Sequence, residues 1–309
     1  MISADLSGTE DSTVVDDFIA RGVHRFLEPV DPQACAALLA DLKADRAWGG
    51  DLFLEEAAFD ADPQYRGVNP RPGRNLLERF ADRLGFVEQA PQIVAGLTAV
   101  LGPGYRILDR KVVCGVPDSA MPAWLKARIA GNPVNNLGPY VQPLYRDVTY
   151  FYGIDFHQDL IDFKGREADF LTLYVYLSRV GPDDAPLYLL EGSHRLGAAV
   201  FPHDLGRRDA DHWRYRSGDR EMDCRQVLLL GEAGSVSMWH ACTLHGTQPD
   251  ATDQERISLR YLFERAPGAR GGLDRINAGL LGPLRLDDTR IDLDAEGAAR
   301  IKANSVNQA

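Results

Sequence analysis

The 309-residue sequence predicts a mainly β fold with a helical first third. Residues 104–266 hold short runs rich in Val, Tyr, Phe and Leu, and Gly, Pro and Asp turns separate these runs. That spacing favours a β-sandwich or jelly roll over a parallel α/β sheet, whose strands would alternate with helices. Residues 14–103 differ, because their apolar residues recur at steps of three and four, the period of an amphipathic helix.

The helical region is expected to contain three helices. The first has Asp31 as its N-cap and Pro32 at its first helical position, where no N–H is needed. Two further segments, RNLLERFADRLGF and APQIVAGLTAVLG, repeat the pattern, and each reaches a glycine near its end, a usual helix stop. We expect these helices to pack on the outside of the strands.

The strands are expected in seven segments, of which the first is YRILDRKVVCGV. Residues 115–147 are rich in Pro, Gly and Asn, and we interpret them as an insertion or lid with one short helix around Trp124 to Ile129. In residues 203–225 the arginines are matched by acids, so a second insertion, a solvated loop, is expected there. The other strand segments are VTYFYGIDFHQD, DFLTLYVYLSRV, APLYLLEGS, RQVLLL, GSVSMWHACTLHG and RISLRYLF.

This organisation predicts a single catalytic domain. Its parts are a helical support region (14–103), a β core with the two insertions (104–266) and a C-terminal extension with a polar, frayed end (267–309).

Composition excludes several classes of protein. The net charge of −11 and the pI near 5.1 argue against a nucleic-acid or anionic-membrane surface, which would need a basic footprint. No apolar run approaches the roughly 20 residues of a membrane span. The four cysteines have no C-x-x-C spacing, and the acidic start lacks the pattern of a secretory signal, so we expect a cytoplasmic protein.

The segment YFYGIDFHQDLIDFKG contains the first candidate site residues, His157 and Asp159. On a strand, residues two apart point to the same side, so both could reach one metal ion. The pair alone also fits an ordinary strand with charges on its polar face. A third ligand from another strand decides between these interpretations, and His245 in the WHACTLHG run can supply it.

Arg256 follows His245 by eleven residues, across a stretch with the Gly, Pro and Asp of a tight connection. Ser258 points to the same side as Arg256 on a strand, and an arginine beside a hydroxyl is a natural carboxylate receptor. Two histidines and one carboxylate form the facial triad of non-haem Fe(II) oxygenases. A 2-oxo acid can chelate such a metal and leave one position for O₂.

From about Lys111 to Phe263 the chain resembles the phytanoyl-CoA dioxygenase family of Fe(II)- and 2-oxoglutarate-dependent oxygenases. The resemblance rests on HQD followed by LIDF, then on TLYVYLSRV, APLYLLEGSH and GSVSMWHACTLHG, with the arginine beyond. Glu191 stands where the family has a proline before Gly-Ser-His, a departure that affects a turn more than the site. The resemblance implies a double-stranded β-helix, a cupin-like jelly-roll barrel.

The resemblance also implies Fe(II), the co-substrate 2-oxoglutarate and O₂. It makes His157, Asp159 and His245 the iron ligands. Arg256 would bind the distal carboxylate of 2-oxoglutarate, with Ser258 as a helper. By position, further co-substrate contacts would come from Gln158, Lys111 and Thr172.

The expected reaction is hydroxylation of a small organic metabolite, or a related desaturation or cyclisation, with release of succinate and CO₂. Halogenating relatives have Ala or Gly at the metal carboxylate, whereas Asp159 is present here. Two alternatives stay open, a cupin-type metal-dependent isomerase or hydrolase and a non-catalytic binding barrel. The sequence leaves the substrate and the oligomeric state open, and it assigns substrate choice to residues 117–145 and 203–225.

Other polar residues are given structural roles. Arg260 would face the same side as Arg256, but the eleven-residue spacing favours Arg256. His240 should point away from His245 on a strand. His194 is expected to stabilise a turn, and the remaining histidines of the second insertion, His203 and His212, are expected to be solvated.

Overall fold

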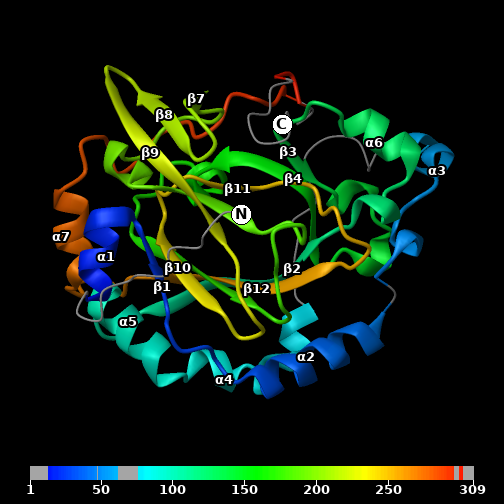
Figure 1. Cartoon of the computed structure of the whole chain (residues 1–309), viewed down its shortest axis with the longest axis horizontal. Coiled ribbons are helices and arrows are strands. Elements are labelled where there is room, and N and C mark those ends of the chain that lie inside the picture. The colour runs from blue at the N-terminus through cyan, green and yellow to red at the C-terminus, as the bar shows by residue number, and fades with distance from the viewer. Residues whose placement is uncertain (1–12, 47, 62–75, 296–298, 302–309) are drawn as a thin grey trace.

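The computed structural model describes residues 13–46, 48–61, 76–295 and 299–301. Within them, twelve strands pair in the order β1-β10-β5-β12-β2-β4-β11-β6-β9-β8-β7, and β3 pairs with β4 (Figure 1). Almost all neighbours are antiparallel, and only β2 and β4 run parallel. The strands are β1 Val23–Arg25, β2 Arg106–Gly115, β3 Val134–Asn136, β4 Thr149–His157, β5 Phe170–Tyr176, β6 Leu187–Glu191, β7 Asp204–Arg207, β8 His212–Ser217, β9 Arg220–Leu229, β10 Val236–His240, β11 His245–Thr247 and β12 Arg256–Glu264.

Helices lie around the outside of this sheet (Figure 1). Asp31 caps α2 as predicted, since its carboxylate accepts a hydrogen bond from the Gln33 backbone N–H (2.8 Å). The predicted stop of α5 is also confirmed, because the Gly102 N–H closes that helix at φ +84°. The helices are α1 Val14–Arg21, α2 Pro32–Asp45, α3 Glu56–Ala61, α4 Gly85–Glu88, α5 Pro91–Leu101, α6 Ala123–Ile129 and α7 Gly272–Ala278.

One expected helix is wrong. In RNLLERFADRLGF the chain forms a 3₁₀ segment, Leu76–Arg83, with a kink at Phe80, and then the single turn of α4; residues 74 and 75 lie outside the described residues. Leu76, Leu77 and Leu84 are fully buried against the sheet. Packing of these leucines overrides the helical period, as tertiary contacts often do.

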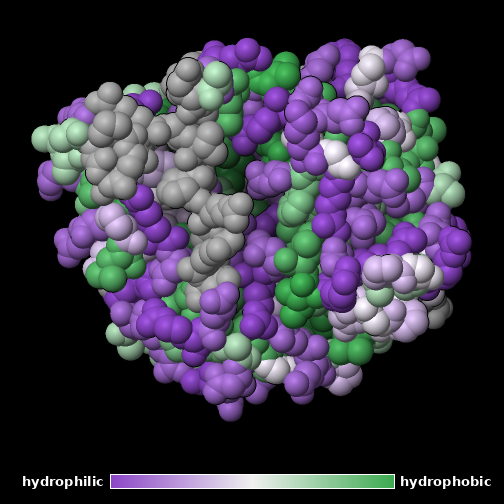
Figure 2. Space-filling model, turned by 180° about the vertical axis from the view of Figure 1, so that it is seen from behind, coloured by the Kyte–Doolittle hydropathy of each residue, from purple (hydrophilic) through white to green (hydrophobic). Residues whose placement is uncertain are grey.

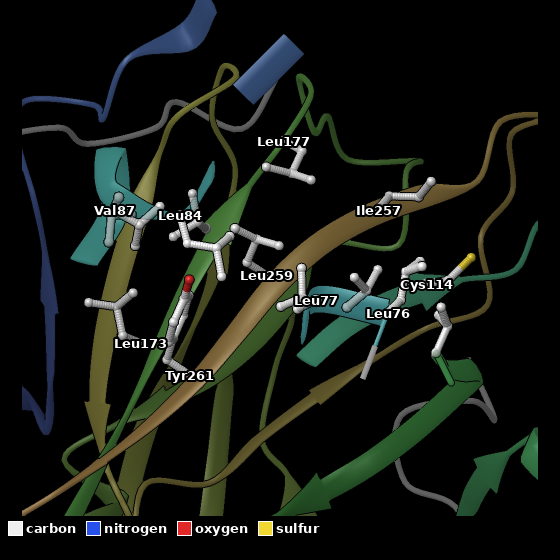
Figure 3. Close-up of a cluster of buried hydrophobic side chains, with 14 of the residues drawn as sticks. Leu76, Leu77, Leu84, Val87, Cys114, Leu173, Leu177, Ile257, Leu259 and Tyr261 are labelled. Carbon is white, nitrogen blue, oxygen red and sulfur yellow. The ribbon is translucent and has the colours of Figure 1, made fainter. Parts of the chain in front are cut away.

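The helices and the sheet share a large core. Leu173 of β5 and Leu259 and Tyr261 of β12 point toward the helical layer and meet Leu77 and Leu84 (Figure 3). Because side chains alternate along a strand, the residues between them point to the other face of the sheet. On β12 these are Arg256, Ser258 and Arg260, so the same strand builds the core and carries polar groups inward.

The inner face of the sheet is enclosed because the sheet rolls over itself. Tyr174 of β5 and Trp239 of β10 share an inner cluster with Leu187 and Leu189 of β6, from the other half of the strand order. The Trp239 ring lies 5.0 Å from the ring of His245, which is on β11. The predicted jelly roll with helices outside is therefore confirmed.

The two insertions turned out differently. The short helix expected around Trp124 to Ile129 is α6. Residues 203–225, however, are not a solvated loop, because β7, β8 and the first half of β9 form an antiparallel extension of the sheet. The arginines and acids of this segment pair across its strands, for example Arg216 with Glu221 (3.0 Å). The alternating arginines and acids of this segment therefore belong to paired strands. Composition alone did not distinguish such strands from a solvated loop.

The outer surface is mostly polar on the face that Figure 2 shows. Figure 2 shows a largely hydrophilic face on which hydrophobic residues gather in a narrow band. Within the part of the chain that the structure describes, no helix is long and apolar enough to cross a membrane.

We predict that Leu259→Ala lowers the free energy of unfolding by about 2–5 kcal/mol, because it leaves a cavity between β12 and the helical layer. The matched control is Ile107→Ala on neighbouring β2, where the side chain is 39% exposed. That change should cost less than about 1 kcal/mol. Urea unfolding followed by circular dichroism checks both values, and equal losses would contradict the assignment of the core.

We also predict that the protein loses stability between pH 7 and pH 5. Burial lowers the pKa of His194 to about 3 and that of His240 to about 4, so both stay neutral in the folded chain. The unfolded chain takes up protons below a pKa of about 6.5, so stability is full above that pH and falls as pH decreases.

The expected loss from these two histidines is about 4 kcal/mol at pH 5 relative to pH 7, since each takes up its proton over about 1.5 pH units and each pKa unit corresponds to about 1.4 kcal/mol. Urea unfolding at both pH values measures it. His240→Gln, which can keep the hydrogen bond to Asn277, should reduce the pH dependence by about one proton. Equal stability of the wild type at the two pH values would contradict the prediction.

Candidate metal and co-substrate site

Strand pairing brings the two predicted histidine ligands together. His245 of β11 lies directly opposite His157, the last residue of β4, and their ring centroids are 4.2 Å apart. The close approach of these strands requires Gly246, because a Cβ there would lie 2.7 Å from the Ile154 carbonyl oxygen. Sequence spacing alone could not give this register, which places two imidazoles on one side of the roll.

Both imidazoles are held in the form that binds a metal. Nδ1 of His157 lies 3.0 Å from the Asp155 carbonyl oxygen, and Nδ1 of His245 lies 3.1 Å from that of Thr243. A ring that donates its Nδ1 proton to a carbonyl keeps the Nε2 lone pair for a metal. Burial and then the neighbouring His245 lower the pKa of His157 to about 3, so its ring is neutral at ordinary pH.

The third predicted ligand does not lie on the same strand as His157. β4 ends at His157, and Asp159 begins a short 3₁₀ turn, Asp159–Asp162. The carboxylate is 2% exposed and accepts hydrogen bonds at Oδ2 from Thr172 Oγ1 (2.5 Å) and Trp239 Nε1 (2.9 Å). Thr172 and Trp239 are cross-strand partners on β5 and β10, so the facing sheet fixes this carboxylate.

Arg260 forms an ion pair with the other oxygen of Asp159. Burial alone would raise the pKa of this carboxyl group, but Arg260, followed by the two histidines, holds it well below its usual range. Oδ2 lies 3.7 Å from Nε2 of His245. The three predicted ligand groups thus lie near one another, although their donor atoms do not all come within 4.8 Å. Arg260 engages the carboxylate in this arrangement.

A second group of possible metal ligands differs from the predicted one, because its residues are exposed. Among the described residues, Asp209, Asp211 and His212 place their donor atoms within 4.8 Å of one another. All three are exposed, and exposed acidic groups of this kind are common without a metal. Their position on the sheet extension provides a useful control for iron binding.

Arg256 has the surroundings of a carboxylate receptor. It is 3% exposed, and neither Nε nor Nη1 has a hydrogen-bond partner among the described residues. The hydroxyls of Ser258 and Tyr174 are also buried without a partner, and the guanidinium lies 5.8 Å from the centre of the Tyr174 ring. Unpartnered buried donors are costly, so this group fits an anionic ligand such as the distal carboxylate of 2-oxoglutarate.

Room for the guanidinium comes from the neighbouring strand. Arg256 lies opposite Gly115 of β2, and a Cβ at that position would lie 3.3 Å from Nε of Arg256. Arg256 and the three predicted ligands, His157, Asp159 and His245, line one cavity of about 70 Å³.

The other predicted co-substrate contacts are placed differently. Gln158 is buried with its amide directed away from the cavity, since Nε2 donates to the carbonyls of Gly197 (2.8 Å) and Cys242 (3.0 Å). Thr172 contacts Asp159. Lys111 lines the cavity, but it lies opposite Arg260 and four residues from the partner of Arg256.

Three residues that line the cavity were either not predicted as site residues or were ranked second. Trp239 and Tyr174 were assigned to no site, and Arg260 was ranked behind Arg256. The signal for Arg260 was available, because it shares a strand face with Arg256. Trp239 could not be found from sequence, since its contact with Asp159 depends on the β5–β10 register.

The remaining histidines divide into confirmed and corrected expectations. His194 lies in a 3₁₀ turn, and His240 is a buried residue whose Nε2 lies 2.9 Å from Asn277 Oδ1. His212 is exposed as expected. His203 is not solvated, because both of its ring nitrogens are buried, and burial followed by His245 lowers its pKa to about 3. The cause is the β7–β8 extension, which packs Tyr215 against its ring.

Comparisons with known proteins identify relatives of this chain and of its fold. A curated relative, the "probable alpha-ketoglutarate-dependent hypophosphite dioxygenase" of Stutzerimonas stutzeri, is 30% identical over 113 residues. The match covers 36% of this chain, and the chain spans 38% of the length of that relative.

Two solved structures share the fold. The alpha-ketoglutarate-dependent epimerase SnoN from nogalamycin biosynthesis is 16% identical with a TM-score of 0.51, and the alignment covers 92% of this chain and 93% of SnoN. SnoN in complex with Fe³⁺, alpha-ketoglutarate and nogalamycin RO gives a TM-score of 0.50 at 16% identity, with 96% and 95% covered.

The phytanoyl-CoA dioxygenase (PhyH) family matches residues 21–258, which is more than half of the sequence. This match includes both histidines, Asp159 and Arg256. The predicted resemblance is confirmed, and the chain belongs to the phytanoyl-CoA dioxygenase family of Fe(II)- and 2-oxoglutarate-dependent oxygenases.

Proposed function

We propose that this chain is an Fe(II)- and 2-oxoglutarate-dependent oxygenase that hydroxylates a small organic molecule. His157, Asp159 and His245 are the proposed iron ligands, and Arg256 is the proposed receptor for the distal carboxylate of 2-oxoglutarate. The observation that supports this most is the buried guanidinium of Arg256, whose Nε and Nη1 have no partner among the described residues, in the same cavity as two neutral histidines and an ionised carboxylate.

Bound iron, with 2-oxoglutarate and O₂, supplies the oxidation of a substrate C–H bond to C–OH and leaves succinate and CO₂. The protein orients the ligands for this chemistry. The carbonyls of Asp155 and Thr243 fix the imidazole rings, and Thr172 and Trp239 fix the carboxylate. Such supporting hydrogen bonds reduce the ordering that ligand binding requires.

Arg256 sets the direction of the co-substrate in this proposal. A guanidinium binds a carboxylate through two parallel hydrogen bonds, so it fixes orientation as well as position. Tyr174, whose ring lies 5.8 Å from the guanidinium, adds a buried hydroxyl to the same cavity. The buried hydroxyl of Ser258 lies two residues further along β12 and is not part of the cavity lining. Apolar walls from Val113, Phe151 and Leu187 limit the access of water to the cavity.

We predict that Asp159→Ala abolishes coupled turnover and lowers iron content, because one of three ligands is lost. The measurements are succinate release and iron per chain after anaerobic loading. The control is Asp209→Ala in the exposed group on the sheet extension, which should keep iron and turnover. Loss of iron in Asp209→Ala, with iron retained in Asp159→Ala, would place the metal elsewhere.

We predict that Arg256→Met weakens 2-oxoglutarate binding by about 2–5 kcal/mol, the usual cost of removing one partner of a buried charge pair. This corresponds to a loss of affinity of roughly 30-fold or more. The visible charge-transfer band of the anaerobic Fe(II)–2-oxoglutarate complex reports the affinity, and iron content should be unchanged.

Arg260→Met is the matched comparison, because it removes the same side chain four residues further along β12. A larger shift in 2-oxoglutarate affinity for Arg260→Met than for Arg256→Met would reverse the assignment of the two arginines. Absence of any band in folded, iron-loaded wild type would contradict the proposed function itself.

A further inference from the structure

Two cations lie side by side on the inner face of the sheet. Lys111 of β2 and Arg260 of β12 are direct cross-strand partners, and both line the cavity that holds the three ligand groups. Their side chains are only 11% and 13% exposed. Like charges directly opposite each other destabilise a strand pair, so an anion is expected to compensate them.

The chain supplies this compensation only in part. Nζ of Lys111 lies 3.7 Å from Asp109, and Nη1 of Arg260 lies 3.9 Å from the same carboxylate, which is 41% exposed. Both distances exceed that of a hydrogen bond, and water weakens an exposed pair. Asp162 also lines the cavity and acts on both cations at longer range. Burial, followed by the charge of Arg260, still lowers the pKa of Lys111 to about 8 against the opposing effect of these carboxylates.

The close partner of Arg260 is Asp159, which the proposed function assigns to the metal. A carboxylate bound to a divalent cation has less charge to offer an arginine. About 13 Å of strand separates the Cα atoms of Arg256 and Arg260, so the pair and Arg256 lie at different positions along the cavity. The cavity therefore has a second cationic position beyond the co-substrate receptor.

We propose, building on the proposed function, that Lys111 and Arg260 bind an oxyanion group of the organic substrate. The substrate class is a small amphiphilic acid, whose carboxylate, phosphonate or sulfonate contacts this pair. Its apolar part lies along Phe151, Ile154 and Leu187, which line the same cavity. The two cations then select the substrate and fix its distance from the ligand groups.

The test uses binding instead of turnover. The full-length chain is loaded with Zn(II), which is redox-inert, and with saturating 2-oxoglutarate at pH 7. Calorimetry then measures the binding of butanoate, butylphosphonate and butanesulfonate, with butan-1-ol as the uncharged probe. At least one acid should bind and the alcohol should not, and the preferred acid identifies the oxyanion.

The variants are Lys111→Met, Lys111→Arg and Arg260→Met. Each methionine variant should weaken binding of the acid by about tenfold or more, since a hydrogen bond to a charged group is lost. Lys111→Arg should retain most of the affinity. The matched control is Arg110→Met, because Arg110 is the next residue on β2 but pairs with Glu88 on the other face and should not affect acid binding.

The outcomes separate this proposal from the function on which it rests. If no acid binds the wild type, or if butan-1-ol binds equally well, the oxyanion position is wrong. If Lys111→Met weakens 2-oxoglutarate as much as it weakens the acid, the pair serves the co-substrate and the proposal is overturned. If acid binding depends on Lys111 while the Fe(II)–2-oxoglutarate band is missing, the proposed oxygenase function fails and the anion position stands.

Discussion

The alternation of side chains along β12 is the constraint on which the site depends. Ile257, Leu259 and Tyr261 anchor the strand in the core beneath the helices, and this fixes where the residues between them point. Arg256, Ser258 and Arg260 are thereby held on the inner face. A slip of one residue would exchange the two sets and bury the arginines in the apolar core. The register of β12 therefore determines both the packing of the core and the positions of the polar residues in the cavity.

The carboxylate of Asp159 shows how much of the site is electrostatic. Four groups compete for or share its two oxygens: Thr172, Trp239, Arg260 and, at a longer distance, His245. The two neutral donors position it, and the arginine keeps it ionised despite complete burial. A buried carboxylate without such partners would take up a proton and lose its value as a metal ligand. The facing sheet thus supplies the charge state as well as the position.

The sequence was sufficient to predict the jelly roll, the capped start of α2 at Asp31 and some of the residues that line one cavity, namely Lys111, His157, Asp159, His245 and Arg256. These depend on local patterns or on the spacing of a few residue types. Features that depend on register were not accessible. The pairing of His157 with His245, the placement of Trp239 on Asp159 and the withdrawal of Gln158 to backbone carbonyls all follow from which strands meet. The expectation that His203 is solvated was wrong for the same reason. Its neighbours in sequence are polar, but the pairing of β7 with β8 places Tyr215 against its ring and buries it.

The sheet extension also bears on how the molecule behaves beside its own copies. The order of paired strands ends at β1, of three residues, and at β7, of four. An open edge offers unpaired N–H and C=O groups to any extended chain, and short or charged edge strands discourage this. β7 is short and has charged residues at both ends, and Arg216 of its partner β8 lies 3.5 Å from Asp204. The charged hairpin that looked like a solvated loop is therefore a barrier to edge-to-edge aggregation, and neutralising its charges would remove that protection without touching the cavity.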